Sequence, residues 1–198
     1  VIIGTGSNST VHTIALTQQA RDLGADAALV VTPYYNKPPQ RALVKHFEAV
    51  ARVGLPVIIY NLPQRTQCDI LPETVMELAA NPHIVAIKDA SGDVARVTLW
   101  RELGCSLSLL SGDDASLPAF LRAGGDGAIS VTANLLPSCV HALCEAGLNK
   151  DEASLSVIEK TLKPLNEALF CESNPIPLKF FMAQAGLIKN YLRLPLVP

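Results

Sequence analysis

The sequence repeats one pattern six times, and this repeat restricts the chain to a small set of folds. Each repeat has a short apolar run, a small or polar turn, and a stretch with helical periodicity. The apolar runs begin at Val1, Ala28, Pro56, Ile84, Leu107 and Gly127. Such runs are typical of strands that are covered on both faces in a parallel sheet. The pattern therefore predicts consecutive βα units and an α/β fold.

Two architectures are built from consecutive βα units. A doubly wound sheet usually carries a glycine-rich phosphate turn after its first strand, and Gly4-Thr-Gly6 lacks the third glycine of that turn. A (β/α)8 TIM barrel places its catalytic groups where the strands end, and Tyr60, Lys88 and Asp113 each end or follow an apolar run. Because the chain also starts inside a run, we expect a TIM barrel that lacks its first two βα units.

The repeat stops after the sixth unit, and the remaining sequence has only helical periodicity. Helices are expected over about 151–170 and 175–185, followed by an uncapped end. We therefore predict that residues 1–148 form barrel units three to eight. Residues 149–198 are expected to form part of a C-terminal helical extension, truncated at its end.

Composition excludes several classes of protein. The chain is 49% hydrophobic and 17% charged, which is too apolar for a disordered chain. No apolar run reaches the ~18–20 residues of a membrane-spanning helix. A net charge of −2 provides no basic surface for nucleic acid or an anionic membrane. The five cysteines form no CxxC pair, which is typical of reduced thiols and predicts a cytoplasmic protein.

Lys88 is the strongest chemical signal in the sequence. It lies in the apolar run Ile84–Ile87 and its continuation, where burial would lower the pKa of its amine and make it nucleophilic. A buried amine at the end of a strand is what Schiff-base catalysis on a carbonyl compound requires. The structural alternative is an ion pair between Lys88 and Asp89 or another acid.

Other polar residues near the strand ends have both functional and structural interpretations. Tyr60 can relay protons, or it is a half-buried strand aromatic. Arg65 can bind a carboxylate in a two-pronged fork, or it is a solvated loop residue. Tyr34 and Tyr35 precede a proline-rich turn, a pattern also common at subunit interfaces.

Asp113 and Asp114 have no His or Cys partner nearby in the sequence, so we interpret them as caps of a helix over 115–123 rather than metal ligands. The histidines have no ligand spacing, and the sequence has no phosphate-binding loop. Of the kinds of catalysis considered, carbonyl chemistry without a cofactor is the one that these residues still support.

Six segments, taken in order, resemble the dihydrodipicolinate synthase family of pyruvate-dependent class I aldolases, which also contains N-acetylneuraminate lyase. The segments are Gly4–Asn8, Thr32–Asn36, Tyr60–Thr66, Ile87–Gly92, Leu110–Asp114 and Gly127–Val131. The resemblance extends over essentially the whole chain. It implies a TIM barrel and a homo-oligomer, usually a dimer of dimers.

The resemblance also implies roles for single residues. Lys88 matches the lysine that forms the imine with pyruvate, and Tyr60 matches the tyrosine that shuttles protons. Tyr35 matches a relay tyrosine that reaches into the site of the neighbouring subunit. Arg65 matches the arginine that binds the carboxylate of aspartate semialdehyde. Two further residues, Ile129 and Gly112, match the lining of the pyruvate pocket.

Arg65 separates two branches of the family. In the resemblance, the Pro63-Gln-Arg-Thr66 segment is found in members that condense pyruvate with aspartate semialdehyde, the first committed step of diaminopimelate and lysine biosynthesis. N-acetylneuraminate lyases lack this arginine. One alternative is another pyruvate-dependent aldolase, such as N-acetylneuraminate lyase. The other is an inactive fragment or a non-catalytic barrel module.

Two departures from the family pattern concern the relay and the regulation. The family takes hydroxyl groups of its relay from a Gly-Thr-Thr/Ser-Gly-Glu segment, which this sequence does not contain. Asn8 and Tyr34 match contacts of an allosteric lysine site between subunits. His12 stands where many members have an acid, which would weaken the binding of the ammonium group of lysine.

Overall fold

The computed structural model describes all 198 residues, and the six apolar runs form one parallel sheet. The strands are β1 (Ile2–Gly4), β2 (Ala27–Val31), β3 (Val57–Asn61), β4 (Ile84–Asp89), β5 (Ser108–Ser111) and β6 (Gly127–Ala128). They pair in sequence order, each parallel to the next. This order excludes a doubly wound sheet, whose strand order reverses at a switch point. The α/β prediction is confirmed.

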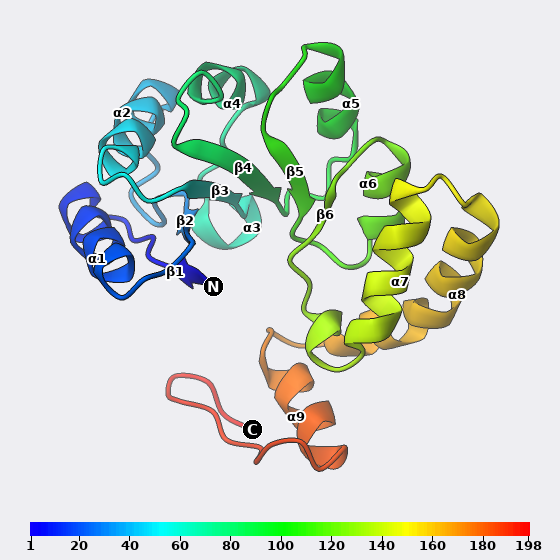
Figure 1. Cartoon of the computed structure of the whole chain (residues 1–198). Coiled ribbons are helices and arrows are strands. Elements are labelled where there is room, and N and C mark those ends of the chain that lie inside the picture. Colours follow the sequence, from blue (N-terminus) through cyan, green and yellow to red (C-terminus); the bar gives the residue numbers. More distant parts are fainter.

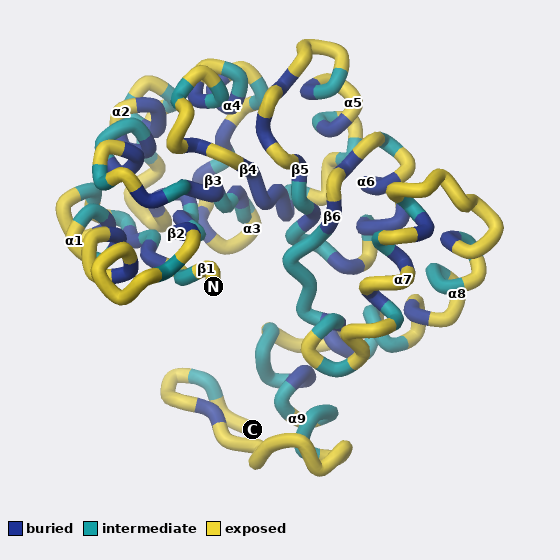
Figure 2. Tube along the Cα trace, in the orientation of Figure 1, coloured by how far each residue is buried: buried dark blue, intermediate teal, exposed yellow.

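Helices cover one face of the curved sheet (Figure 1). They are α1 (Thr10–Asp22), α2 (Gln40–Ala51), α4 (Pro72–Leu78), α5 (Ala95–Glu102), α6 (Leu117–Arg122) and α7 (Pro137–Leu148). Strands β2, β3 and β4 are buried along most of their length, and the outer sides of the helices are exposed (Figure 2). This burial explains why the runs are apolar without alternation.

Alternate strand residues belong to different parts of the core. Ile59 and Ile87 pack with Trp100 in the large cluster between the sheet and the helices. Ile58 and Ala86 belong to a small cluster separate from it. Because successive side chains point to opposite faces, Tyr60 and Lys88 share a face with Ile58 and Ala86, away from the helices.

The prediction that Asp113 and Asp114 cap the next helix is wrong for both residues, because the N-cap of α6 is Ser116 and no side chain makes a cap hydrogen bond there. Helix α6 begins at Leu117, and Asp113 Oδ2 accepts hydrogen bonds from the backbone N and Oγ of Ser116 at 2.9 and 2.6 Å. Asp114 is 3% exposed, and its Oδ2 accepts from the backbone N of Val131 at 2.9 Å and of Thr132 at 3.2 Å. It therefore holds the turn that follows β6, which leads into the 3-10 turn η1 (Thr132–Asn134).

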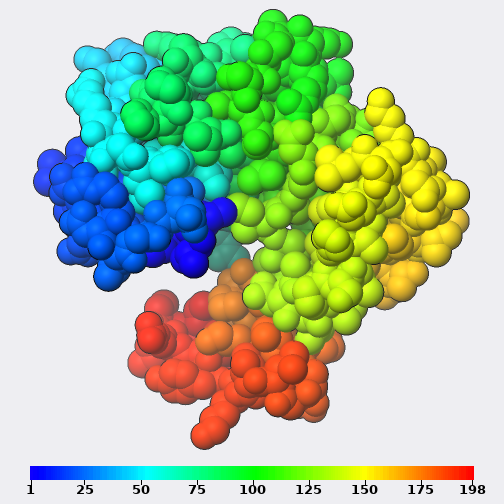
Figure 3. All heavy atoms as spheres, viewed as in Figure 1, coloured from blue at the N-terminus to red at the C-terminus, as the bar shows by residue number.

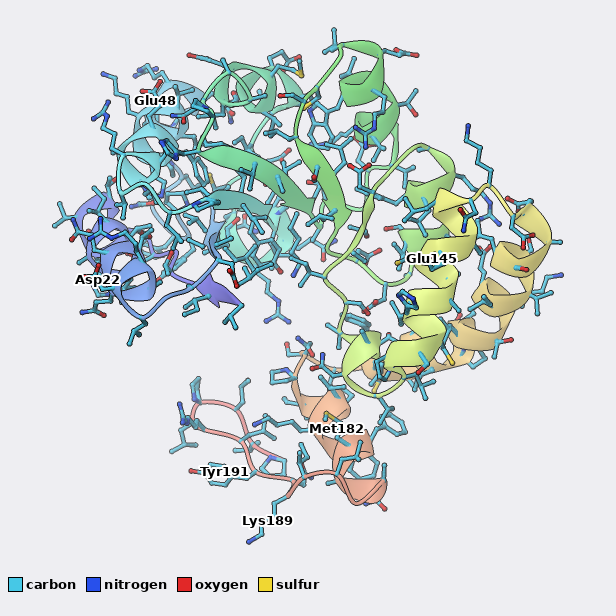
Figure 4. The ribbon with its side chains drawn as sticks, viewed as in Figure 1. Asp22, Glu48, Glu145, Met182, Lys189 and Tyr191 are labelled. Atoms are coloured by element: carbon cyan, nitrogen blue, oxygen red, sulfur yellow. The ribbon has the colours of Figure 1, made fainter.

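The C-terminal region contains the two expected helices, α8 (Glu152–Leu169) and α9 (Ile176–Gln184). Helix α8 packs against α6 and α7 through a second core cluster. Residues 186–198 form no helix or strand, and in the space-filling view they lie with α9 apart from the N-terminal helix (Figure 3). Figure 4 shows Lys189 and Tyr191 on this segment, both exposed. No helix in the structure combines the length and the hydropathy needed to cross a bilayer.

Candidate active site

Strands β3 and β4 place Tyr60 and Lys88 next to each other at their carboxyl ends. The two residues are direct partners in the register of the parallel pair. The Nζ atom of Lys88 lies 4.0 Å from the centroid of the Tyr60 ring. This pairing brings together the two residues for which the sequence suggested nucleophilic and proton-relay chemistry.

The amine of Lys88 is buried without an ionic partner. The residue is 9% exposed and takes part in none of the ion pairs of the structure. The alternative partner, Asp89, instead accepts hydrogen bonds from Asn61 and Ser91. Burial lowers the pKa of the Lys88 amine, and the carboxylate of Asp114 partly opposes this shift. A larger fraction of neutral, nucleophilic amine follows.

Gly112 provides the space that the Lys88 side chain occupies. A Cβ atom at this position would lie 2.8 Å from Lys88 Cε and 2.8 Å from Ala90 Cβ. The backbone N of Gly112 also donates to the carbonyl oxygen of Asp89 at 2.7 Å, which ties the end of β5 to β4. A side chain larger than hydrogen therefore cannot be added here without moving the lysine.

Arg65 lies on a one-turn helix, α3 (Pro63–Thr66), directly after β3, and not in the loop that the sequence suggested. Its Nη2 donates to the carbonyl oxygen of Asn174 at 3.2 Å. This contact joins the end of β3 to the segment between α8 and α9. Burial raises the pKa of the Tyr60 phenol, and the Arg65 charge partly opposes that effect.

One cavity of about 340 Å³ brings these groups together. Its lining includes Tyr60, Arg65, Lys88 and Gly112. The lining residues that the sequence reasoning missed include Val131, Phe170 and Asn174, which lie far from Lys88 in the sequence. They come from the turn after β6 and from the C-terminal region, so no local pattern connects them to Lys88. The Asn174 Oδ1 atom is buried and has no hydrogen-bond partner.

Two of the residues suggested by the resemblance lie outside this lining. Tyr35 is 87% exposed and has a positive φ of 74°, and its backbone N donates to the Thr66 carbonyl oxygen at 3.2 Å. Ile129 follows β6, and its backbone N donates to Ser111 O at 2.9 Å. The structure therefore presents the Tyr35 ring to solvent rather than to the cavity of its own chain.

The three residues suggested for regulation also lie outside the cavity. The carbonyl oxygen of Asn8 accepts from Asn36 Nδ2 at 2.9 Å, which brings Asn8 to the turn that carries Tyr34. Tyr34 is 42% exposed. His12 is exposed in the first turn of α1, where its backbone N donates to the Oγ of the N-cap residue Ser9 at 3.4 Å.

Comparison with known proteins identifies the family. The sequence model of the dihydrodipicolinate synthetase family matches residues 1–198. The chain belongs to this family. The resemblance carried by the six ordered segments is thereby confirmed.

Individual members of the dihydrodipicolinate synthetase family are similar over the whole chain. The chain is 52% identical over 201 residues to the 4-hydroxy-tetrahydrodipicolinate synthase of Alcanivorax borkumensis and 49% identical over 199 residues to that of Coxiella burnetii, covering 68% of each. The dihydrodipicolinate synthase of Acinetobacter baumannii, solved in complex with pyruvate, superimposes with a TM-score of 0.96 at 47% identity. That match covers 100% of this chain and 68% of the other.

Proposed function

We propose that this chain carries the site of a 4-hydroxy-tetrahydrodipicolinate synthase, which condenses pyruvate with aspartate semialdehyde in diaminopimelate and lysine biosynthesis. The observation that carries the proposal is the buried, unpaired Lys88 amine, 4.0 Å from the Tyr60 ring and in one cavity with Arg65. The names of the similar enzymes support the reaction, and the pyruvate complex of one relative supports the first substrate.

The proposed chemistry needs no cofactor because the imine itself accepts electrons. The neutral Lys88 amine attacks the keto carbon of pyruvate, and the resulting carbinolamine loses water to give an imine. Tyr60 carries protons to and from the oxygen that leaves. The imine acidifies the pyruvate methyl group, and the enamine formed by loss of a proton attacks the aldehyde carbon. The bond between Lys88 Nζ and the former keto carbon is broken last. Either water or the amino group of the condensed aspartate semialdehyde, as it closes the ring, replaces the lysine at that carbon.

Reductive trapping tests the first step. The chain is incubated with pyruvate, reduced with borohydride and digested, and the modified peptide is located by mass spectrometry. We expect a single pyruvate adduct on Lys88, because its lowered pKa distinguishes it from the exposed lysines. An adduct spread over surface lysines, or none at all, would exclude this function for the chain.

Substitution of Gly112 by alanine is expected to slow trapping without removing the lysine. The added Cβ would overlap Lys88 Cε and Ala90 Cβ, each at 2.8 Å, so the amine must leave its position beside Tyr60. We expect trapping to slow at least about tenfold and stability to fall by about 1–3 kcal/mol. Gly4→Ala is the matched control, since nothing lies within 4 Å of a Cβ at that glycine. Equal trapping rates in the two variants would contradict the crowding argument.

Arg65→Ala is expected to separate the two substrates. The guanidinium is proposed to hold the carboxylate of aspartate semialdehyde, a charge-assisted contact whose loss raises the KM for that substrate roughly 10–100-fold. Pyruvate trapping at Lys88 should stay within about twofold, because Lys88 and not Arg65 forms the imine. Arg52→Ala, an exposed arginine after α2, is the control. Equal loss for both substrates would favour another pyruvate aldolase.

Tyr35 and the oligomer form a further part of the proposal. A relay tyrosine that serves a neighbouring subunit must project from its own chain, and the 87% exposure of Tyr35 supports this role. We propose a homo-oligomer, arranged as a dimer of dimers. Ile129 is proposed to reach the pyruvate pocket through the β6 turn.

The remaining proposals concern architecture, regulation and location. The sequential strand order supports six units of a (β/α)8 barrel, units three to eight, over residues 1–148, with residues 149–198 as a partial helical extension. Asn8, His12 and Tyr34 are proposed to belong to a lysine-binding site with weakened recognition of the ammonium group. The five unpaired cysteines support a reducing, cytoplasmic location.

A further inference from the structure

A polar cluster lies on the side of β3 and β4 that faces the helices, opposite Tyr60 and Lys88. Asn61 and Asp89 follow these two residues directly in the chain and are partners in the strand register. Because side chains alternate along a strand, they point to the other face of the sheet. We call this group the Asn61 cluster; it comprises Asn61, Asp69, Asp89, Ser91 and Arg96.

Asn61 is the centre of the cluster and uses its whole amide. It is 0% exposed, and its Nδ2 donates to Asp69 Oδ1 at 2.9 Å and to Asp89 Oδ1 at 2.8 Å. Its Oδ1 accepts from the backbone N of Ile70 at 3.2 Å. A neutral amide is the one side-chain group that donates to two carboxylates while accepting from a backbone N–H. The orientation of Asn61 is therefore determined by its partners.

The charges of the cluster hold it together across several elements. Arg96 on α5 binds Asp69 with two contacts, Nη1 to Oδ1 at 2.8 Å and Nη2 to Oδ2 at 2.6 Å. Ser91 Oγ donates to Asp89 Oδ2 at 2.6 Å. Arg96 and Asn61 lower the pKa of Asp69, whereas burial raises the pKa of Asp89. Two carboxylates are thus satisfied by one guanidinium, one amide and one hydroxyl group.

We propose that Asn61 and Asp89 are positioning residues, whose cluster holds the ends of β3 and β4 so that Tyr60 stays against the Lys88 amine. Backbone hydrogen bonds from the same two residues also fix the strand ends. Ala90 N, after β4, donates to Asn61 O at 2.9 Å, and Gly112 N, after β5, donates to Asp89 O at 2.7 Å. The inference rests on the proposed function, since it assigns the cluster to imine formation. Asp114, not a member of the cluster, is the carboxylate whose charge acts on Lys88, so the role is geometric.

The test compares Asp89→Ala with Asp89→Asn in the full chain. In the asparagine variant Oδ1 still accepts from Asn61, so trapping at saturating pyruvate should stay within about threefold of the wild type. The alanine variant leaves an Asn61 N–H without an acceptor, and trapping should slow at least about tenfold at a temperature at which the protein is folded. For Asp89→Asn, the midpoint of the pH profile of trapping should not move, because Asp114 rather than Asp89 acts on Lys88 through its charge. Should Asp89→Ala not fold, Ser91→Ala, which removes one bond to Asp89, should slow trapping about fivefold, more than the change allowed for Asp89→Asn.

Asp126→Ala is the control for a general loss of stability. Asp126 Oδ2 accepts from Arg101 Nη2 at 2.6 Å and from Leu109 N at 2.7 Å, so it also bridges an arginine and a strand, away from the cavity. Its substitution should lower the thermal midpoint and leave the trapping rate unchanged. Wild-type trapping in folded Asp89→Ala, or equal slowing in Asp126→Ala, would overturn the positioning role.

A second measurement separates this inference from the proposed function. Reductive methylation with formaldehyde and cyanoborohydride modifies any accessible amine and needs no substrate pocket. If pyruvate leaves wild-type Lys88 unmodified, the proposed function fails. The methylation rate of Lys88 still tests the positioning role, because it does not depend on pyruvate binding. In the wild type, Lys88 should be methylated faster than the exposed lysines because its pKa is lowered, and in Asp89→Ala, where the amine is no longer held beside Tyr60, this excess should fall about tenfold. An unchanged methylation rate would overturn it.

Discussion

Lys88→Met is expected to abolish the pyruvate adduct and, at neutral pH, to make the chain more stable. The amine is 9% exposed and has no ionic partner, so the folded state carries the cost of burying a charge. Methionine has a similar length and no charge. We expect a gain of roughly 1–3 kcal/mol in the free energy of unfolding near pH 7. The contact of the ammonium with the Tyr60 ring, worth about 0.5–2 kcal/mol, reduces this gain.

The pH dependence gives this prediction a definite sign. Burial lowers the pKa of Lys88 from its ordinary value of 10.5, so between the two values the unfolded state binds more protons than the folded state. Wild-type stability therefore gains with rising pH across that window, and the advantage of Lys88→Met is largest below it and shrinks toward pH 10.5. Urea unfolding at several pH values measures the difference.

Lys45→Met is the control for these effects, because Lys45 is exposed on α2. It should change neither the adduct nor the stability. A less stable Lys88→Met variant would mean that the amine is favourably paired in the folded state. An adduct that persists in this variant would assign the nucleophile to another residue.

Asp114→Ala is expected to destabilise the chain far more than the same change at its neighbour Asp113. The Asp114 carboxylate accepts from Ser130 Oγ and from the backbone N of Val131 and Thr132. Its loss leaves buried donors without an acceptor, which we expect to cost about 3 kcal/mol or more. Asp113→Ala loses two hydrogen bonds to the half-buried Ser116 and should cost about 1 kcal/mol. Urea unfolding of both variants measures the difference, and equal losses would contradict it.

The charge of Asp114 also has a kinetic consequence. It raises the pKa of Lys88 against the larger effect of burial. In Asp114→Asn this opposition is removed, so the Lys88 pKa falls further and the neutral amine persists to lower pH. The pH profile of reductive trapping should therefore shift toward acid. A shift toward alkaline pH would show that Asp114 does not act on Lys88 through its charge.

Much of the fold was predictable because the relevant forces are local. Each strand of the sheet coincides with an apolar run, since strand residues on the helix-covered face and on the opposite face both belong to core clusters. The extent of α8 also followed from its helical periodicity. The burial of Lys88 was predictable for the same reason, because it is the lone amine in an apolar run.

The sequence by itself therefore determined the six βα units, the family and the burial of the Lys88 amine. Only the tertiary structure decided which neighbours each polar residue has. Arg65 meets the carbonyl oxygen of Asn174, which is distant in the sequence, and Asp113 and Asp114 serve different elements although they are adjacent. Asn61 gave no signal because its role depends on two carboxylates supplied by other segments. Helix and strand preferences act between near neighbours in the chain, whereas hydrogen bonds of buried polar groups are set by packing between distant ones.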